Sequence, residues 1–340
     1  MNPDGGRPLS EQSERSRPLS EQSRPLPEPV EGFAVRYRAA VAERGRLCAG
    51  IDPHAALLEQ WGLPVSVDGL RSFAQACVTG LGPVAAVIKP QVAFFEAFGS
   101  AGFAVLEETI AGCREAGAIV LADAKRGDIG STMAAYTTAW LDDASPLCSD
   151  AVTVSPYLGF GALDPAVARA RATGRGVFAL ARTSNPEGAA LQTAVSPADP
   201  VPADSVPADP SPADPSLVER SRDHSSSPGT SRVGARTVAQ SIVDAAAAVN
   251  ADGSGTVGLV VGATREHGLD LSALAGPILS PGLGAQGATA ADLAAIFAAT
   301  ADLSWLLPAA SRSILGAGPD PAALADATRR TRDEIEAALR

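Results

Sequence analysis

Only two of the 27 basic residues in this 340-residue chain are lysines, Lys89 and Lys125, and all the others are arginines. Arginine stays protonated in proteins, whereas the surroundings of a lysine readily tune its pKa, so that a lysine can act as an acid or as a Schiff-base nucleophile. A chain that uses arginine wherever charge alone is needed makes its two lysines conspicuous. We take both as candidate catalytic residues.

Acidic residues accompany the lysines. Asp123 and Asp128 flank Lys125 in the segment DAKRGD, and Asp52 ends an earlier apolar run. Side chains alternate along a strand, so Asp123 and Lys125 point to one side. In a shared cavity, alternating charges favour each other's ionised forms, and a lysine held protonated can donate a proton to a forming carbanion. We therefore predict that Lys125, Asp123, Lys89 and Asp128 form a catalytic array rather than unrelated surface ion pairs.

These residues stand at or near the ends of short apolar runs that alternate with Ala-rich helical patterns. Eight such runs separated by helices are typical of a closed (β/α)₈ barrel, the TIM barrel, whose active site lies at the carboxyl ends of the strands. An open doubly wound sheet is the alternative, but no G-x-G-x-x-G follows the first run. The predicted strands are 47–52, 85–90, 118–125, 151–156, 176–182, 257–264, 277–282 and 304–309, and the predicted helices are 31–44, 68–82, 100–116, 130–142, 161–173, 233–249, 289–300 and 320–339.

The last two runs are followed by loops suited to an anion. SPGLGAQG, residues 280–287, follows the seventh run and supplies glycines that free backbone amides, together with the side-chain donor Gln286. Arg312 follows the eighth run and suits a bidentate phosphate contact. Glycine-rich turns are common as plain turns, but the loops after strands seven and eight of such barrels often bind phosphate. Their position predicts a phosphate site.

Two segments have low complexity. Residues 1–29 repeat RPLSEQS, and residues 192–231, after the fifth strand, are rich in Pro, Ala, Asp and Ser. Such polar, Pro-rich sequence cannot bury a core, so we expect a disordered N-terminal tail and a disordered insert. The remaining sequence within 30–340 predicts a single barrel domain.

Composition excludes several classes of function. A net charge of −11 argues against a nucleic-acid partner, because phosphate-backbone binders carry a basic surface. No apolar run reaches about 18 residues, which argues against a membrane partner. The four cysteines are widely spaced and the histidines His54, His224 and His267 are scattered, so we expect reduced thiols, a cytoplasmic protein, and neither a metal nor another cofactor.

The motif LADAKRGDIGST, residues 121–132, resembles the D-x-K-x-x-D signature of the orotidine 5′-phosphate decarboxylase family, in its longer bacterial, actinobacterial-like branch. GIDPH, VIKPQVAFFE, SPYLG, LARTSNPEG, SPGLGAQG and ASRSIL are similar to that family in order and barrel position, and the resemblance runs from Phe33 to Arg340 apart from the insert. It implies a cofactor-free enzyme of pyrimidine biosynthesis that converts orotidine 5′-monophosphate to UMP and CO₂. It also implies a homodimer with shared active sites.

The resemblance assigns roles to individual residues. It implies that Lys125 donates a proton to pyrimidine C6, that Asp123 lies against the departing carboxylate, and that Asp128 reaches the site of a neighbouring protomer. The implied substrate contacts are Asp52 and Lys89 to ribose hydroxyls, Ile129 and Thr132 beside Asp128 across the dimer, Ser155 to the pyrimidine, and Gln286, Arg312, Pro281 and Gly282 to the 5′-phosphate.

Other activities of the same barrel type remain open at this point. A sugar-phosphate decarboxylase or aldol-type synthase would bind Mg²⁺ through its carboxylates, but an acidic ligand is expected where this chain has Lys89. A Schiff-base aldolase prefers a desolvated lysine without flanking carboxylates. A non-catalytic barrel that binds a phosphate ligand would not need Lys125 and Asp123.

Overall fold

The structure is a computed structural model that describes residues 30–196, 236–263, 266–284 and 287–340. All of these except Val30 belong to one structural unit, Glu31–Arg340. The predicted tail, 1–29, and the predicted insert from residue 197 onward lie outside the described residues. The first five residues of that predicted insert, 192–196, are described.

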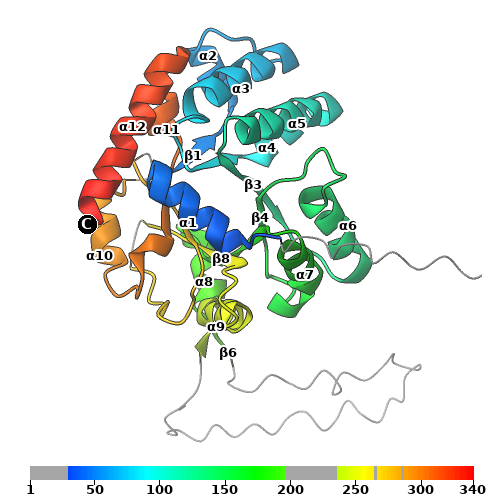
Figure 1. Ribbon diagram of the computed structural model, residues 1–340, viewed down its shortest axis with the longest axis vertical. Coiled ribbons are helices and arrows are strands. Elements are labelled where there is room, and N and C mark those ends of the chain that lie inside the picture. Colours follow the sequence, from blue (N-terminus) through cyan, green and yellow to red (C-terminus); the bar gives the residue numbers. More distant parts are fainter. Residues whose placement is uncertain (1–29, 197–235, 264–265, 285–286) are drawn as a thin grey trace, which may run out of the picture. The chain divides into compact units, whose positions relative to one another are not determined.

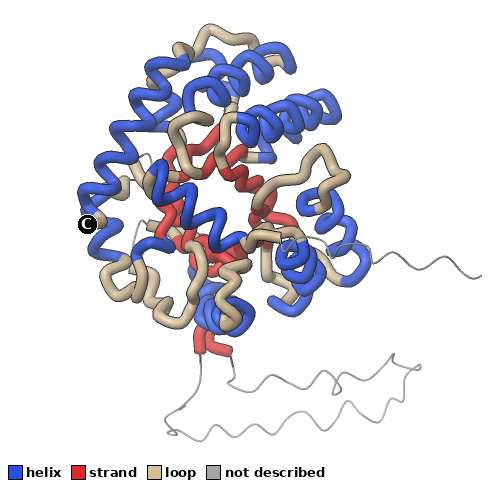
Figure 2. The backbone as a smooth tube through the Cα atoms, viewed as in Figure 1, coloured by secondary structure: helices blue, strands red, loops and turns tan. Residues whose placement is uncertain are grey.

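Eight parallel strands close into a barrel, and each corresponds to one predicted run. Neighbouring strands pair in parallel, including the first with the last. Figure 2 shows the red strands arranged as a ring. The prediction of a (β/α)₈ barrel is therefore confirmed. The strands are β1 (Cys48–Ile51), β2 (Val87–Pro90), β3 (Ile119–Arg126), β4 (Ala151–Val154), β5 (Gly176–Arg182), β8 (Val257–Val261), β9 (Ile278–Pro281) and β10 (Leu306–Ala310).

Helices surround the ring (Figure 1), and each of the eight predicted helical segments overlaps one of them. Side-chain caps fix several helix starts: Thr237, for example, accepts a hydrogen bond from the amide of Gln240. The predicted helices are α1 (Phe33–Arg44), α3 (Val67–Leu81), α5 (Gly99–Glu115), α6 (Gly130–Leu141), α7 (Asp164–Ala172), α9 (Val238–Asn250), α10 (Ala290–Ile296) and α12 (Pro321–Ala338).

Several short helices were not predicted, because three to six residues are too few to display a helical period. They lie mostly in the loops that follow strands. They are α2 (Ala55–Gln60), α4 (Val92–Glu96), α8 (Ala189–Gln192), α11 (Arg312–Leu315) and the 3₁₀ turns η2 (Pro186–Gly188) and η5 (Leu303–Trp305). A further 3₁₀ turn, η1 (Phe160–Leu163), forms the start of the helical segment predicted over 161–173.

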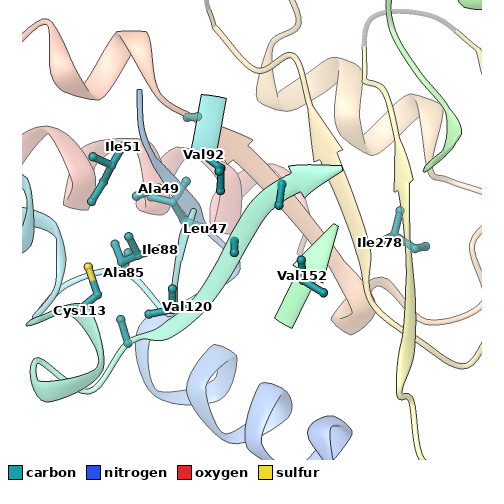
Figure 3. Close-up of a cluster of buried hydrophobic side chains, with 14 of the residues drawn as sticks. Leu47, Ala49, Ile51, Ala85, Ile88, Val92, Cys113, Val120, Val152 and Ile278 are labelled. Carbon is teal, nitrogen blue, oxygen red and sulfur yellow. The ribbon is translucent and has the colours of Figure 1, made fainter. Parts of the chain in front are cut away.

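The strands separate two apolar clusters. Val120 and Ala122 of β3 pack toward the helices, in the larger cluster drawn in part in Figure 3. Ile119 and Leu121 belong to the second cluster, together with residues of the other strands and of α1. This period of two places residues 123 and 125 on the same side as Ile119 and Leu121, toward the barrel interior.

Helix α1 covers the amino-terminal end of the barrel, where Figure 1 shows it crossing the ring. Phe33 meets Phe178 of β5 edge to face at 6.1 Å, and Tyr37 stacks on Trp305 at 5.7 Å. The Tyr37 hydroxyl also donates to the carbonyl of Trp305. Apolar side chains therefore fill this end, and the polar side chains of the interior lie toward the carboxyl ends of the strands.

A two-stranded antiparallel pair joins the flanks of the segment 197–235. β6 (Val195–Ser196) pairs with β7 (Arg236–Thr237), with Ser196 opposite Arg236. The amide of Val238 adds a hydrogen bond to the carbonyl of Ala194. Strands of two residues carry no readable pattern, so this pair was not predicted. In the described part of the chain, no helix has the length and apolarity needed to span a membrane.

Candidate active site

Asp123 lies at the centre of a cluster of charged residues inside the barrel. Its Oδ2 accepts a hydrogen bond from Lys89 Nζ at 3.0 Å, and its Oδ1 accepts one from Lys125 Nζ at 2.6 Å. The hydroxyl of Thr153, on the neighbouring strand β4, also donates to Oδ1 at 2.9 Å. Asp123 and Lys89 are buried, whereas the side chain of Lys125 is about half exposed. The two lysines of the chain thus converge on one carboxylate.

The charges in this cluster stabilise one another. Burial alone would raise the pKa of Asp123, but the ammonium groups of Lys89 and Lys125 hold it well below its usual range. Burial alone would lower the pKa of Lys89, but Asp123 and Asp52 raise it above its usual range. Near neutral pH the interior therefore contains a carboxylate, Asp123, and an ammonium, Lys89.

The end of β3 has an unusual backbone that directs Lys125. Lys125 has a φ of +49°, in the left-handed region of backbone conformation that residues other than glycine rarely adopt. The pairing of β3 with β4 shifts its register between Ala122 and Arg126. The Lys125 amide donates to the Thr153 hydroxyl at 2.9 Å, so one buried threonine holds both this amide and the carboxylate of Asp123.

A pocket of about 290 Å³ opens over the cluster at the carboxyl ends of the strands. Its walls combine the charged groups with an apolar floor and with the loops after β5, β9 and β10. The lining residues are Asp52, Lys89, Gln91, Asp123, Lys125, Leu180, Thr183, Ser184, Asn185, Val260, Leu279, Pro281, Gly282, Leu283, Ala309, Ala310, Ser311 and Arg312.

The structure brings together part of the site that the sequence predicts. Four predicted residues do not line the pocket of their own chain, and Gln286 lies outside the described residues. The predicted residues in the pocket wall are Asp52, Lys89, Asp123, Lys125, Pro281, Gly282 and Arg312, and those that do not line it are Asp128, Ile129, Thr132 and Ser155.

Those four residues lie in the segments that follow β3 and β4. Asp128 Oδ1 accepts a hydrogen bond from the amide of Ile129, whose side chain is 61% exposed. Thr132 is exposed on α6. Ser155 is held to the end of β3 by a hydrogen bond from its amide to the carbonyl of Arg126.

Two pocket residues that we did not single out from the sequence are Gln91 and Ser311. Gln91 Oε1, Ser311 Oγ and one oxygen of Asp52 are buried without a hydrogen-bond partner in the structure. A Cβ on Gly50 would lie 2.8 Å from Ser311 Cβ and 3.3 Å from Asp52 Oδ1, so glycine keeps this space open. Gln91 stands two residues after Lys89, and the period of two would have placed it on the same side.

Thr153 is the third residue missed. It lies inside a predicted strand, and nothing local in AVTV indicates that its hydroxyl would meet a carboxylate 30 residues earlier. Alternation does place it on the same side of β4 as Ser155.

The described residues contain no cluster of three or more His, Cys, Asp or Glu side chains arranged to hold a metal ion. His54 packs its ring against Phe94. All four cysteines are buried and unpaired. Burial raises the pKa of the Cys48 thiol to about 12, so this group beside Lys89 and Asp123 stays a neutral thiol.

Comparisons with known proteins agree on one family. The sequence model of the Orotidine 5′-phosphate decarboxylase / HUMPS family matches residues 45–206. The chain is 51% identical over 313 residues to the orotidine 5′-phosphate decarboxylase of Salinispora arenicola, covering 91% of this chain and 99% of the relative. It is 49% identical over 304 residues to that of Corynebacterium glutamicum, covering 88% and 96%.

Solved structures give the same result. A crystal structure from Streptomyces avermitilis, described under the same enzyme name, superimposes with a TM-score of 0.77 at 47% identity and covers 91% of this chain and 96% of that one. The OMP decarboxylase of Leishmania donovani superimposes with a TM-score of 0.63 at 28% identity, covering 91% and 99%.

Proposed function

Because the chain belongs to the orotidine 5′-phosphate decarboxylase family and converts orotidine 5′-monophosphate to UMP and CO₂, we propose that Lys125 donates the proton that replaces the carboxylate at C6. The observation that carries this proposal is the contact of Lys89 and Lys125 with one buried carboxylate, Asp123. Loss of CO₂ leaves an electron pair on C6, and the Lys125 ammonium supplies the proton to it. The half-exposed lysine then regains a proton from water.

The charges of the array act on this step in two ways. An ammonium already in place beside C6 stabilises the developing carbanion without reorganisation of the surroundings. Asp123, ionised and buried, lies beside the position that we propose for the substrate carboxylate. Removal of that carboxylate as neutral CO₂ ends a repulsion between two anions.

The remaining pocket wall supports a proposal for substrate binding. Asp52 and Lys89 hold ribose hydroxyls, and Arg312, Pro281 and Gly282 hold the 5′-phosphate, with Gln286 added by the family resemblance alone. Support comes from the position of the first five residues around one pocket. Binding energy at the phosphate, remote from C6, is then available to order the loops of the site.

We also propose a homodimer in which Asp128, Ile129 and Thr132 complete the pocket of the neighbouring protomer, and in which Ser155 contacts the pyrimidine. The first three residues lie outside the pocket of their own chain. Around them, the segments after β3 and β4 expose large apolar side chains, Ile129 at 61%, Tyr157 at 75% and Leu158 at 52%. Removal of such side chains from water favours association.

A mixing experiment tests the shared site. Asp128→Ala and Lys125→Ala homodimers are each expected to be inactive. After exchange of subunits, each heterodimer regains one intact site, so random mixing should restore about a quarter of wild-type activity. Mixing without any recovery would contradict the contribution of Asp128 across the interface.

The reaction, as proposed, requires no cofactor, and we place the protein in the cytoplasm without a nucleic-acid partner. The Lys–Asp array supplies the proton and the charge that the chemistry needs, and Lys89 stands where a Mg²⁺-dependent relative is expected to have an acidic ligand. Four buried, unpaired thiols are typical of a reducing compartment. The net charge of −11 disfavours binding to a phosphate backbone.

The direct test follows the loss of orotidine 5′-monophosphate by absorbance, with EDTA present and no cofactor added. We expect wild-type activity to survive chelation. Lys125→Ala and Lys125→Arg should both lower kcat by at least about 10²- to 10⁴-fold, because arginine keeps the charge but does not release the proton. Activity that EDTA abolishes would favour the Mg²⁺-dependent alternative, and full activity in Lys125→Arg would refute Lys125 as the proton donor.

A further inference from the structure

Gln192, the last residue of α8, is bonded to the loop that follows β5 but does not line the pocket. Its Oε1 accepts hydrogen bonds from the amide of Thr183 at 3.1 Å and from Arg182 Nη1 at 3.2 Å. Its Nε2 donates to Thr183 Oγ1 at 2.7 Å. Both ends of one side-chain amide are therefore used on two successive residues, which fixes the orientation of that amide.

Thr183 passes the hydrogen bonds on to Asn185, a second residue of the pocket wall. Thr183 Oγ1 donates to Asn185 Oδ1 at 2.6 Å, and Asn185 Nδ2 donates to Glu187 Oε2 at 3.0 Å. Because the single proton of the Thr183 hydroxyl goes to Asn185, this hydroxyl can only accept from Gln192. Thr183 and Asn185 both line the pocket, so the donor group of Gln192 determines the direction of the hydrogen bonds in that wall.

Glycines bring the chain close around this loop. A Cβ on Gly188 would lie 2.8 Å from Gln192 Nε2 and 3.0 Å from Thr183 Oγ1. On the other side, a Cβ on Gly262, which follows β8, would lie 2.9 Å from the amide nitrogen of Ser184. The segment 183–185 is thus packed between α8 and the end of β8.

Gln192 also stands where the chain leaves the barrel. β6 begins three residues later, and its pairing with β7 closes the base of the segment 197–235. The three hydrogen bonds of its side chain to Arg182 and Thr183 therefore link α8, at the edge of that base, to the loop after β5 in the pocket wall.

We propose that Gln192 is a positioning residue for the decarboxylation, which holds Thr183 and Asn185 in the arrangement that binds the substrate. The inference rests on the proposed function of the pocket. Without the Gln192 amide, the Thr183 backbone N–H and Arg182 lose their acceptor, and the loop becomes free to adopt other conformations. Substrate binding then has to order the loop, so the loss falls on KM rather than on the chemical step.

The test compares Gln192→Ala with Gln240→Ala. Gln240 is the matched control, because its side-chain amide, like that of Gln192, holds a loop backbone. It accepts from the Asp270 amide at 2.8 Å and donates to the Asp270 carbonyl at 3.1 Å, away from the pocket. We expect Gln192→Ala to raise KM about fivefold while kcat stays within about twofold of the wild type. Gln240→Ala should lower the melting temperature by a similar amount to Gln192→Ala but leave KM unchanged.

Hydrogen exchange of the free protein gives a readout that does not depend on activity. The amides of residues 182–185 should exchange faster in Gln192→Ala than in the wild type, and at the wild-type rate in Gln240→Ala. Unchanged exchange in this segment, or a rise in KM equal to that of Gln240→Ala, would overturn the positioning role. A wild-type protein that does not consume orotidine 5′-monophosphate would overturn the proposed function instead, while the exchange result would still decide the role of Gln192 in the loop.

Gln192→Glu separates the two ends of the amide and serves if Gln192→Ala does not fold. The carboxylate keeps both acceptor bonds but cannot donate to Thr183 Oγ1, so the Thr183 hydroxyl turns toward it and Asn185 Oδ1 loses its donor. We expect near-wild-type melting temperature and exchange, with KM raised about threefold. Wild-type KM in this variant would refute the claim that the Gln192 donor orients the pocket wall.

Discussion

Thr153 offers a sharp test of how the charged cluster is held, because Thr153→Val removes one hydroxyl at almost constant shape. That hydroxyl donates to Asp123 Oδ1 and accepts from the Lys125 amide, both at 2.9 Å, and the residue is fully buried. The substitution therefore breaks two hydrogen bonds and opens little or no cavity.

The two bonds differ in what their loss costs. A hydrogen bond to a charged group contributes about 1.5–3 kcal/mol, and a buried backbone N–H left without an acceptor costs about 1–3 kcal/mol. The orphaned amide belongs to Lys125, whose left-handed backbone conformation itself costs on the order of 1–2 kcal/mol. We expect the free energy of unfolding to fall by about 3 kcal/mol. If about 2 kcal/mol of the loss is expressed in the transition state, kcat falls about 30-fold.

The assay combines kcat and KM for orotidine 5′-monophosphate with a melting curve. Thr137→Val is the matched control: Thr137 is also buried, but its hydroxyl donates to the Met133 carbonyl within α6, away from the pocket. We expect the control to keep its kcat. A Thr153→Val enzyme with wild-type kcat, or with a loss no greater than that of the control, would show that neither bond positions the reacting groups.

Three further predictions follow from the pocket and from the base of the insert. Lys89→Met removes one of the two ammonium groups that lower the pKa of Asp123, so this pKa should rise toward its ordinary value of 3.8. Because the reaction requires the carboxylate form, the acid limb of the profile of kcat/KM against pH should move to higher pH. An acid limb that does not move would contradict the effect of Lys89 on the pKa of Asp123. For the same reason the stability that Asp123 contributes above its unfolded pKa, and loses as pH falls, should depend less on pH in this variant. Ser311→Ala, measured by steady-state kinetics, should raise KM about threefold without loss of melting temperature, because the Ser311 hydroxyl has no hydrogen-bond partner in the protein. The control is Ser304→Ala, which removes another buried hydroxyl without a partner and should leave KM unchanged. Equal effects of the two variants on KM would exclude a contact from Ser311 to the substrate. Replacement of residues 197–235 by Asn-Gly, a two-residue turn that can close the β6–β7 pair, should keep kcat/KM within about twofold of the wild type. A loss of kcat/KM beyond about tenfold would show that the segment 197–235 takes part in the reaction.

The barrel was predictable because its strands are buried on both faces. Each strand reads as a continuous apolar run, and helices of seven residues or more separate most of the runs, so that composition and spacing suffice. The side on which Asp123 and Lys125 lie followed from the period of two alone. The short helices α2, α4, α8 and α11 were missed because they contain too few residues to show a period.

The rest of the site depends on contacts between distant parts of the chain. Nothing in the sequence indicates that Thr153 would bridge Asp123 and the Lys125 amide, because that contact requires the register of β3 against β4. Gln192 was hidden in the same way, as the sequence places it in the low-complexity insert. Asp128, Ile129 and Thr132 differ from these residues, because we propose that they complete the pocket of a neighbouring protomer. Their role therefore depends on the arrangement of two chains and not on the fold of one.

The closure of the barrel has a consequence for how the protein is made. β1 has one of its two neighbours, β10, near the far end of the chain, with Cys48 opposite Ala309, and α1 completes its packing only against Trp305. At translation rates of about 5–20 residues per second, the first strand leaves the ribosome roughly ten to fifty seconds before its partner. Throughout that interval the nascent chain presents an unpaired strand edge and an uncovered aromatic helix face, so slow translation of the last quarter of the message would prolong the period in which the polypeptide is most prone to aggregate.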